Sequence, residues 1–194
     1  MKDGAQASHE YYMRLAIEQA KSAAKEGEVP VGAVALWDDG RVVGLGQNRR
    51  EEGKCALCHA ELEAIAMANG TLGGWRLHKC TLYVTLEPCP MCAGAILNSR
   101  IPLLVYGARD EKAGAYGSVF DINALPLNHK TEVISGVLEE ECASLLKDFF
   151  LDLRQKKAKE RAKKQESDQK NGSEPQAEPG SDLFKKDASP DEKS

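Results

Sequence analysis

The chain has 194 residues, which is enough for one well-buried core with length left over, and its formal net charge is −4. Residues 155–194 contain ten Lys and Arg and nine Asp and Glu, which leaves 16 basic and 21 acidic residues in 1–154, a net charge of −5. This balance excludes a protein that binds nucleic acid over its whole surface. A polynucleotide substrate would have to be held by a local basic patch.

The residues from Met1 to Ala7 contain no apolar core segment, so no secretory signal is expected, and no run approaches the length of a membrane span. Six cysteines in a chain without an export signal favour reduced thiols and metal binding over a disulfide framework. We therefore expect a cytoplasmic protein that does not contact a membrane.

The sequence predicts a globular domain over residues 1–154 and a charged tail over 155–194. Beyond Gln155, Lys, Glu, Ser, Gln and Pro dominate, and Leu183 and Phe184 are almost the only large apolar residues. Such a segment cannot bury enough apolar surface to offset its ordering entropy. We expect the last helix to continue to about residue 164 and the rest of the tail to be largely disordered.

Apolar periodicity and turn signals predict alternating helices and strands. Residues 9–26 are predicted as a helix with Ser8 as its N-cap, and Asp38–Gly40 as a hairpin turn. The predicted strands are 29–36, 41–46, 80–86, 101–108 and 133–135. The other predicted helices are 59–69, ended by Gly70, then 90–97, opened by prolines, and 138–164. Two of these helices are apolar on most faces and should be buried, so the pattern indicates a layered α/β domain with one mixed sheet.

Two short motifs supply residues that can carry chemistry: His59-Ala60-Glu61 and Pro88-Cys89-Pro90-Met91-Cys92. A Cys-x-x-Cys pair at a helix start can direct both sulfurs to one point, where the positive helix end favours the thiolate form. Together with an imidazole, these sulfurs make three zinc ligands. Three protein ligands with a fourth position open to water are typical of catalytic zinc, whereas structural zinc is usually closed by four.

Glu61 lies two residues after His59, and in a helix interior such residues point to nearly opposite sides. Both can face one site only if they occupy the first turn of a helix whose end points at that site. The helix starts at His59 and Cys89 should therefore face one cleft. Because two thiolates cancel the charge of the metal, they acidify a bound water less than three histidines would, and a separate base is needed. Glu61 fits that role.

Each motif could also have a purely structural role. A single buried His is more often a satisfied core residue than a ligand, and a single Cys-x-x-Cys is only moderately specific. The combination at this spacing matches the signature of zinc nucleobase deaminases. Cys55-Ala56-Leu57-Cys58-His59 also spells a haem attachment motif, but that use would take His59 from zinc. A second metal contact, a redox-sensitive pair and ordinary loop thiols remain open for Cys55 and Cys58.

The chain resembles the bacterial tRNA-specific adenosine deaminases of the cytidine-deaminase-like superfamily, from about His9 to Arg154. The stretches that carry the resemblance are Glu28–Val34, Asn48-Arg49, His59–Glu61, Leu82–Ala95, Gly107–Asp110 and Asp148–Phe150. The chain departs from the family at Cys55–Cys58, where Asp-Pro-Thr-Ala is common, and at Arg50, where Pro is usual. Neither departure touches a ligand or Glu61.

The resemblance implies a three-layer α/β/α fold and hydrolysis of the wobble adenosine, position 34 of a tRNA anticodon, to inosine by a zinc-activated water. It implies one zinc per subunit, held by His59, Cys89 and Cys92, with Glu61 moving protons. It further implies that Asn48 hydrogen-bonds the purine, that Val29 lines its pocket and that Asp110 meets the sugar of a flanking nucleotide. The family is homodimeric and acts on a tRNA anticodon stem-loop, so DNA is not expected as a partner.

Two other classes of function would use the same metal ligands. A deaminase of free cytosine, guanine or a nucleotide would use the same zinc chemistry, whereas a non-enzymatic zinc or redox module would leave Glu61 without a purpose. Residues 156–164 contain six cations and one anion, and Asp148-Phe149-Phe150 precedes them. This run is either a solvated helix end or a phosphate patch, and the second reading favours a polynucleotide substrate.

Overall fold

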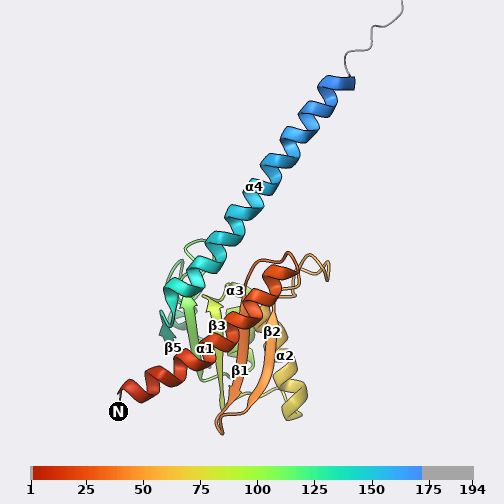
Figure 1. Ribbon diagram of the computed structural model, residues 1–194. Helices are drawn as coiled ribbons and strands as arrows, with labels where there is room; N and C mark the ends of the chain where they lie inside the picture. Colours follow the sequence, from red (N-terminus) through yellow and green to blue (C-terminus); the bar gives the residue numbers. More distant parts are fainter. Residues whose placement is uncertain (1, 172–194) are drawn as a thin grey trace, which may run out of the picture. The chain divides into compact units, whose positions relative to one another are not determined.

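The computed structural model describes residues 2–171, with side chains from 8 to 165, and the chain divides into two compact units, Met1–Arg154 and Gln155–Ser194. The first unit contains five strands and four helices, the last of which continues into the second unit (Figure 1). The elements are α1 (Lys2–Lys25), β1 (Gly32–Trp37), β2 (Val42–Gln47), α2 (Ala60–Leu72), β3 (Cys80–Leu86), α3 (Pro90–Asn98), β4 (Leu103–Ala108), the 3-10 turn η1 (Ile122–Ala124), β5 (Glu132–Ser135) and α4 (Glu139–Asn171).

The five strands form one mixed sheet in the order β2-β1-β3-β4-β5. The hairpin β1–β2 and the pair β1–β3 are antiparallel, while β3–β4 and β4–β5 are parallel. The pair β3–β4 is parallel because α3 crosses from one strand to the other, and the pair β4–β5 because the long segment that contains η1 returns the chain to the same edge. The mixed sheet predicted from the alternation of elements is confirmed.

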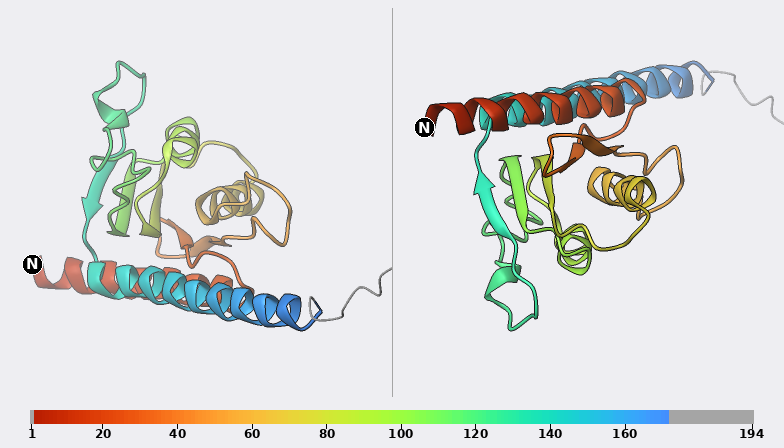
Figure 2. Two further views of the ribbon diagram at one scale, coloured as in Figure 1. Left: turned by 90° about the horizontal axis from the view of Figure 1, so that it is seen from above. Right: turned by 90° about the horizontal axis from the view of Figure 1, so that it is seen from below.

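Helices cover both faces of the sheet within the first unit (Figure 2). On one face, α1 and the start of α4 pack over a cluster that includes Met13, Ile17, Val105 and Cys142, and Arg14 Nη1 lies 2.9 Å from Glu141 Oε2. On the other face, α2 and α3 pack over a larger cluster that includes Ile65, Leu82, Ile96 and Leu104. The three-layer α/β/α fold is therefore confirmed.

Helix α2 lies against β2 at unusually short range because the strand presents glycine there. A Cβ on Gly44 would lie 2.1 Å from the backbone oxygen of Ala64, and one on Gly46 would lie 2.0 Å from that of Ala60. Real Cβ atoms do not approach a backbone oxygen so closely, so only glycine admits this packing. The contact at Gly46 fixes the first turn of α2, which is the turn that carries the candidate site.

Three predicted boundaries differ from the structure. Helix α1 begins at Lys2, so Ser8 lies inside it rather than capping it. Helix α2 continues through Gly70 to Leu72 because the left-handed residue that ends it is Gly73, whose φ is 67° and whose N–H donates to the oxygen of Asn69. Helix α4 ends at Asn171 rather than at about 164, since residues 165–171 contain no Gly or Pro to stop it and include Gln, Glu and Lys, which favour helix.

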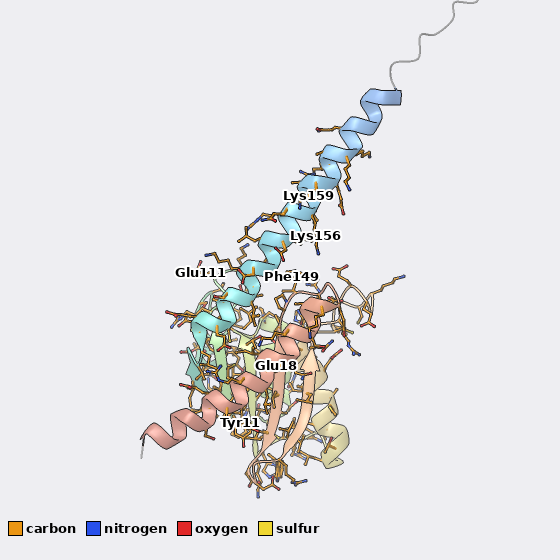
Figure 3. All side chains as sticks on the ribbon, in the orientation of Figure 1. Tyr11, Glu18, Glu111, Phe149, Lys156 and Lys159 are labelled. Atoms are coloured by element: carbon orange, nitrogen blue, oxygen red, sulfur yellow. The ribbon has the colours of Figure 1, made fainter. Side chains whose placement is uncertain are left out.

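The side chains of residues 155–165 are all exposed, and Lys156 and Lys159 project from the helix in Figure 3. The disorder predicted for the end of the tail falls on residues 172–194, which lie outside the described part of the chain. Among residues 2–171, none of the helices combines the length and apolar character needed to cross a bilayer.

The close contact between β2 and α2 can be tested with two glycines. Gly46→Ala should lower the free energy of unfolding by at least about 2 kcal/mol, because the clash is with a backbone oxygen that cannot rotate away. Gly70→Ala is the control: Gly70 is an exposed helical residue with no neighbouring atom within 4 Å of its added Cβ, so stability should rise by about 0.5–1 kcal/mol. Urea denaturation measures both, and equal effects would contradict the packing described.

Candidate active site

Helices α2 and α3 each begin directly after a candidate metal ligand, and these two ligands line the same cavity. His59 is the N-cap of α2 and Cys89 is the N-cap of α3, with Pro90 opening the latter helix. Neither side chain makes a capping hydrogen bond to its own helix. His59 and Cys89 line one cavity, so the expectation that the two helix starts face one cleft is confirmed.

Asn48 supplies the cap that His59 does not. Its side-chain oxygen accepts a hydrogen bond of 3.1 Å from the backbone N–H of Ala60, one of the amide groups that a helix start leaves without an internal partner. Asn48 is buried and lines the same cavity. The bond fixes the orientation of the amide, so its NH₂ group remains available to donate to a ligand.

The donor atoms of His59, Cys89 and Cys92 converge. Nδ1 of His59 lies 3.7 Å from Sγ of Cys89 and 3.5 Å from Sγ of Cys92, and the three atoms all lie within 4.8 Å of one another. Cys92 is buried behind the cavity, in the first turn of α3, while the other two residues face it. An imidazole and two sulfurs at such separations can hold one metal ion.

The surroundings favour a thiolate at this group. Hydrogen bonding from Cys92, reinforced by His59 and opposed by burial, lowers the pKa of Cys89 to about 4. The same hydrogen bond, together with burial, raises the pKa of Cys92, and the bond to Cys89 raises the pKa of His59. A stabilised thiolate is the form of cysteine that binds metals.

Glu61 lies in the first turn of α2 and lines the cavity with only 4% of its surface exposed. Burial raises the pKa of its carboxyl group. A carboxyl group that lines the cavity beside the candidate metal ligands is placed to accept and return protons there. The first-turn position reconciles the two-residue spacing with a shared site, as the sequence predicted.

The cavity in front of these residues has a volume of about 220 Å³. Pockets for drug-sized ligands usually span about 300–1,000 Å³, so this one suits a single planar ring better than a large cofactor. Six of the seven residues singled out from the sequence line it: Val29, Asn48, His59, Glu61, Cys89 and Asp110. The seventh, Cys92, is buried outside the lining, and its sulfur lies 3.5 Å from Nδ1 of His59.

Sequence reasoning missed other residues of the lining, among them Arg50, Leu86, Glu87 and Ala113. Glu87 is the most consequential omission, because its carboxylate is buried beside the ligand motif and holds the loop that follows β4. Its place directly before Pro88-Cys89 was the available signal. Nothing in the local pattern indicates that this acid lies inside the protein.

Cys55 and Cys58 do not join the metal-ligand group: within residues 8–165, that group contains His59, Cys89 and Cys92. The N–H of Cys58 donates to the oxygen of Cys55 at 3.3 Å, and both residues lie in the turn-rich segment before α2. Both are partly exposed thiols. The haem reading, which needed His59 as an iron ligand, has no support in this arrangement.

A mixed sheet that presents His, two Cys and Glu from two helix starts to a base-sized cavity defines the class of hydrolytic deaminases. Comparison with known proteins gives the same class: the MafB19-like deaminase family matches residues 7–154. The tRNA-specific adenosine deaminase of Bacillus subtilis (strain 168) is 49% identical over 149 residues, 76% of this chain and 92% of that protein. The tRNA-specific adenosine deaminase of Haemophilus influenzae is 47% identical over 154 residues, 79% and 89% of the two chains.

Solved structures agree with these matches. A tRNA A34 deaminase that edits A to I at the wobble position superposes with a TM-score of 0.66 and 44% identity, covering 70% of this chain and 99% of that one. A guanine deaminase from Nitrosomonas europaea superposes with a TM-score of 0.61 and 27% sequence identity, covering 72% of this chain and 83% of that one. The chain belongs to the MafB19-like deaminase family and, within it, to the tRNA-specific adenosine deaminases.

Two substitutions separate metal binding from turnover. Glu61→Gln should leave one bound metal per chain and reduce turnover by at least about 100-fold, because only proton transfer is removed. Cys89→Ala should lose both the bound metal and turnover, because it removes a metal ligand. Metal analysis of the purified variants and a deamination assay give the two readouts. Normal turnover in Glu61→Gln would contradict the role assigned to Glu61.

Proposed function

We propose that this protein hydrolyses the wobble adenosine, position 34 of a tRNA anticodon, to inosine with release of ammonia. The observation that carries the proposal is the arrangement of His59, Cys89 and Cys92 beside Glu61 at the floor of a cavity of about 220 Å³. Relatives 42–49% identical, which this chain matches over most of their length, are tRNA-specific adenosine deaminases.

Zinc is the metal proposed for the site, with one ion per subunit. Zn–S bonds of about 2.3 Å and Zn–N bonds of about 2.0–2.1 Å, at a tetrahedral angle, separate nitrogen from sulfur by about 3.6 Å. The observed separations from His59 Nδ1 to the two sulfurs are 3.7 and 3.5 Å. The donor set therefore fits zinc in size and in ligand type, and three protein ligands are the number typical of a catalytic zinc site. Held by these residues, zinc would lower the pKa of water and supply a nucleophile at neutral pH.

In this proposal Glu61 is the catalytic acid and base. Its carboxylate accepts one proton from the attacking water and delivers it to the purine ring nitrogen as the bond from oxygen to C6 forms. It then takes the proton of the hydroxyl group now on C6 and passes it to the amino group, which leaves as ammonia when its bond to C6 breaks. The remaining residues orient the base. Asn48 donates from its NH₂ group to the purine, since its oxygen is already engaged by Ala60, and Val29 packs against the ring in the cavity wall.

The proposed partner is a tRNA anticodon stem-loop, with Asp110 contacting the sugar of a flanking nucleotide. Asp110 is half-buried and lines the cavity, so a nucleotide next to the extruded base could meet its side chain. Residues 156–164, with six cations and one anion, offer local positive charge in a chain whose first unit has a net charge of −5. We accordingly expect the enzyme to work in the cytoplasm, and expect no DNA partner.

We also propose a homodimer, as in the family that the chain resembles. Exposed apolar side chains on the edge strand β2 and on α2 support this proposal: Val42, Leu45 and Met67 are 41%, 37% and 53% exposed. Apolar side chains gathered on an edge strand and its neighbouring helix are typical of an interface. Sedimentation velocity measures the mass, and a single-chain mass at working concentration would contradict the dimer.

The direct test of function is incubation with an anticodon stem-loop that carries a wobble adenosine. Mass spectrometry should show the one-unit increase that accompanies replacement of an amino group by oxygen. Free adenosine, cytosine and guanine are the parallel substrates, since a guanine deaminase shares the fold. Faster deamination of a free base than of the stem-loop would reject the tRNA substrate while leaving the reaction type in place.

A further inference from the structure

One buried carboxylate, that of Glu87, holds a wall of the active site. Glu87 directly follows β3 and precedes Pro88 and the ligand Cys89, and only 1% of its surface is exposed. Within residues 8–165, its carboxylate forms no ion pair with a Lys or Arg. A buried carboxylate without a cation costs several kcal/mol unless hydrogen bonds satisfy it.

Four donors satisfy the carboxylate, and all of them come from the segment after β4. Oε1 accepts from the N–H groups of Tyr116 at 2.9 Å and Ser118 at 3.1 Å. Oε2 accepts from the N–H of Asp110 at 3.2 Å and from the hydroxyl of Ser118. An ionised carboxylate offers about four acceptor sites, so its capacity is filled. These bonds gather both ends of the segment from Asp110 to Ser118 around one side chain.

The segment encloses the carboxylate closely enough to require a glycine. A Cβ on Gly114 would lie 2.4 Å from Cδ of Glu87 and 2.5 Å from Oε2. The segment is also attached to the ligand motif, because the N–H of Ala115 donates to the oxygen of Pro88 at 3.0 Å. One continuous stretch, Glu87–Cys92, thus supplies two metal ligands and anchors the opposite wall of the cavity.

That wall carries Asp110 and Ala113. The Asp110 side chain is itself oriented, since its Oδ1 accepts from the N–H groups of Lys112 at 2.9 Å and Ala113 at 3.2 Å. Within residues 8–165, these are its side-chain hydrogen bonds, which leaves Oδ2 to meet a ligand. The position of Oδ2 relative to the metal ligands therefore depends on the bond from the Asp110 N–H to Glu87.

We propose that Glu87 is a positioning residue that sets Asp110 against the substrate, through the backbone of the segment 110–118. The inference rests on the proposed function, because it assigns to Asp110 the contact with a nucleotide that flanks the reacting base. A displacement of about 1 Å at such a contact is enough to lower the rate substantially. Glu87 itself touches no reacting atom.

The test is a double-mutant cycle between Glu87→Gln and Asp110→Ala, with kcat/KM measured on the anticodon stem-loop. Glutamine keeps one acceptor oxygen, which should replace Oε1, because that atom accepts two backbone N–H groups. Its NH₂ group then replaces Oε2, where the Ser118 hydroxyl can accept from it but the contact to the Asp110 N–H is lost. Each single variant should lower kcat/KM about tenfold. The double variant should also lose about tenfold rather than about a hundredfold, because both substitutions remove the same contact.

Glu28→Gln is the matched control. Glu28 is another buried carboxylate beside the cavity, 2% exposed, and it accepts from the N–H groups of Glu51 at 2.8 Å and Glu52 at 2.9 Å in the other flanking loop. The fold-losses in kcat/KM that Glu28→Gln and Asp110→Ala cause separately should multiply in the double variant. Both Gln variants should retain one metal per chain. Amide hydrogen exchange at Asp110, Tyr116 and Ser118 should accelerate in Glu87→Gln alone.

Losses that multiply between Glu87→Gln and Asp110→Ala would overturn the proposal, as would unchanged exchange in the segment 110–118. A fall in metal content that accounts for the whole loss of activity would show that Glu87 serves only the metal motif, and would also overturn it. If the wild-type protein does not deaminate the stem-loop, the proposed function fails separately. The exchange measurement then still decides whether Glu87 holds the segment.

Discussion

The start of α2 against the sheet is the constraint on which the rest of the site depends. Gly44 and Gly46 let the helix backbone approach β2 to a distance that any side chain would prevent, and this fixes the position of the first turn. That turn holds His59 and Glu61, and it faces the first turn of α3 with Cys89 and Cys92. The positive ends of the two helices favour the thiolates and the developing negative charge of the reaction.

Polar side chains within the protein then fix the segments around this pair of helix ends. Asn48 caps α2, Glu28 holds the segment before it, and Glu87 holds the segment after β4. Each uses oxygen atoms to bind backbone N–H groups that regular structure leaves unpaired. Irregular loops are thereby held in single geometries around a cavity, which is what a site that must orient a base requires.

The layered fold and the metal-ligand group could be predicted from the sequence because both depend on local signals. Strand β3 was predicted at its observed bounds, Cys80–Leu86, from a run of apolar and β-branched residues between polar turns. The convergence of His59 and Cys89 followed from the two-residue spacing to Glu61, since only a helix start allows it. Helix ends were less accessible: Gly70 and Gly73 look alike in sequence, and backbone conformation alone selects Gly73 as the end of α2.

The segment after β4 could not be predicted, because its geometry comes from contacts distant in sequence. Glu87 is 23 residues from Asp110 and 31 from Ser118, and a surface carboxylate would have given the same local pattern. Cys55 and Cys58 show the converse case, in which a local motif is present but the fold does not bring it to the metal-ligand group. Their motif suggested a metal or haem contact, but the turn that carries them leaves both sulfurs outside the group of His59, Cys89 and Cys92.

The fold brings the ligand atoms of His59, Cys89 and Cys92 together, and a zinc ion held by these three residues would keep a fourth position for water. X-ray absorption spectroscopy at the zinc edge, on the protein as purified, tests this most directly. We expect two sulfur neighbours at about 2.3 Å and two lighter neighbours at about 2.0–2.1 Å, one of them the imidazole nitrogen. A shell of three or four sulfurs would mean that Cys55 or Cys58 closes the site, and would contradict a catalytic centre.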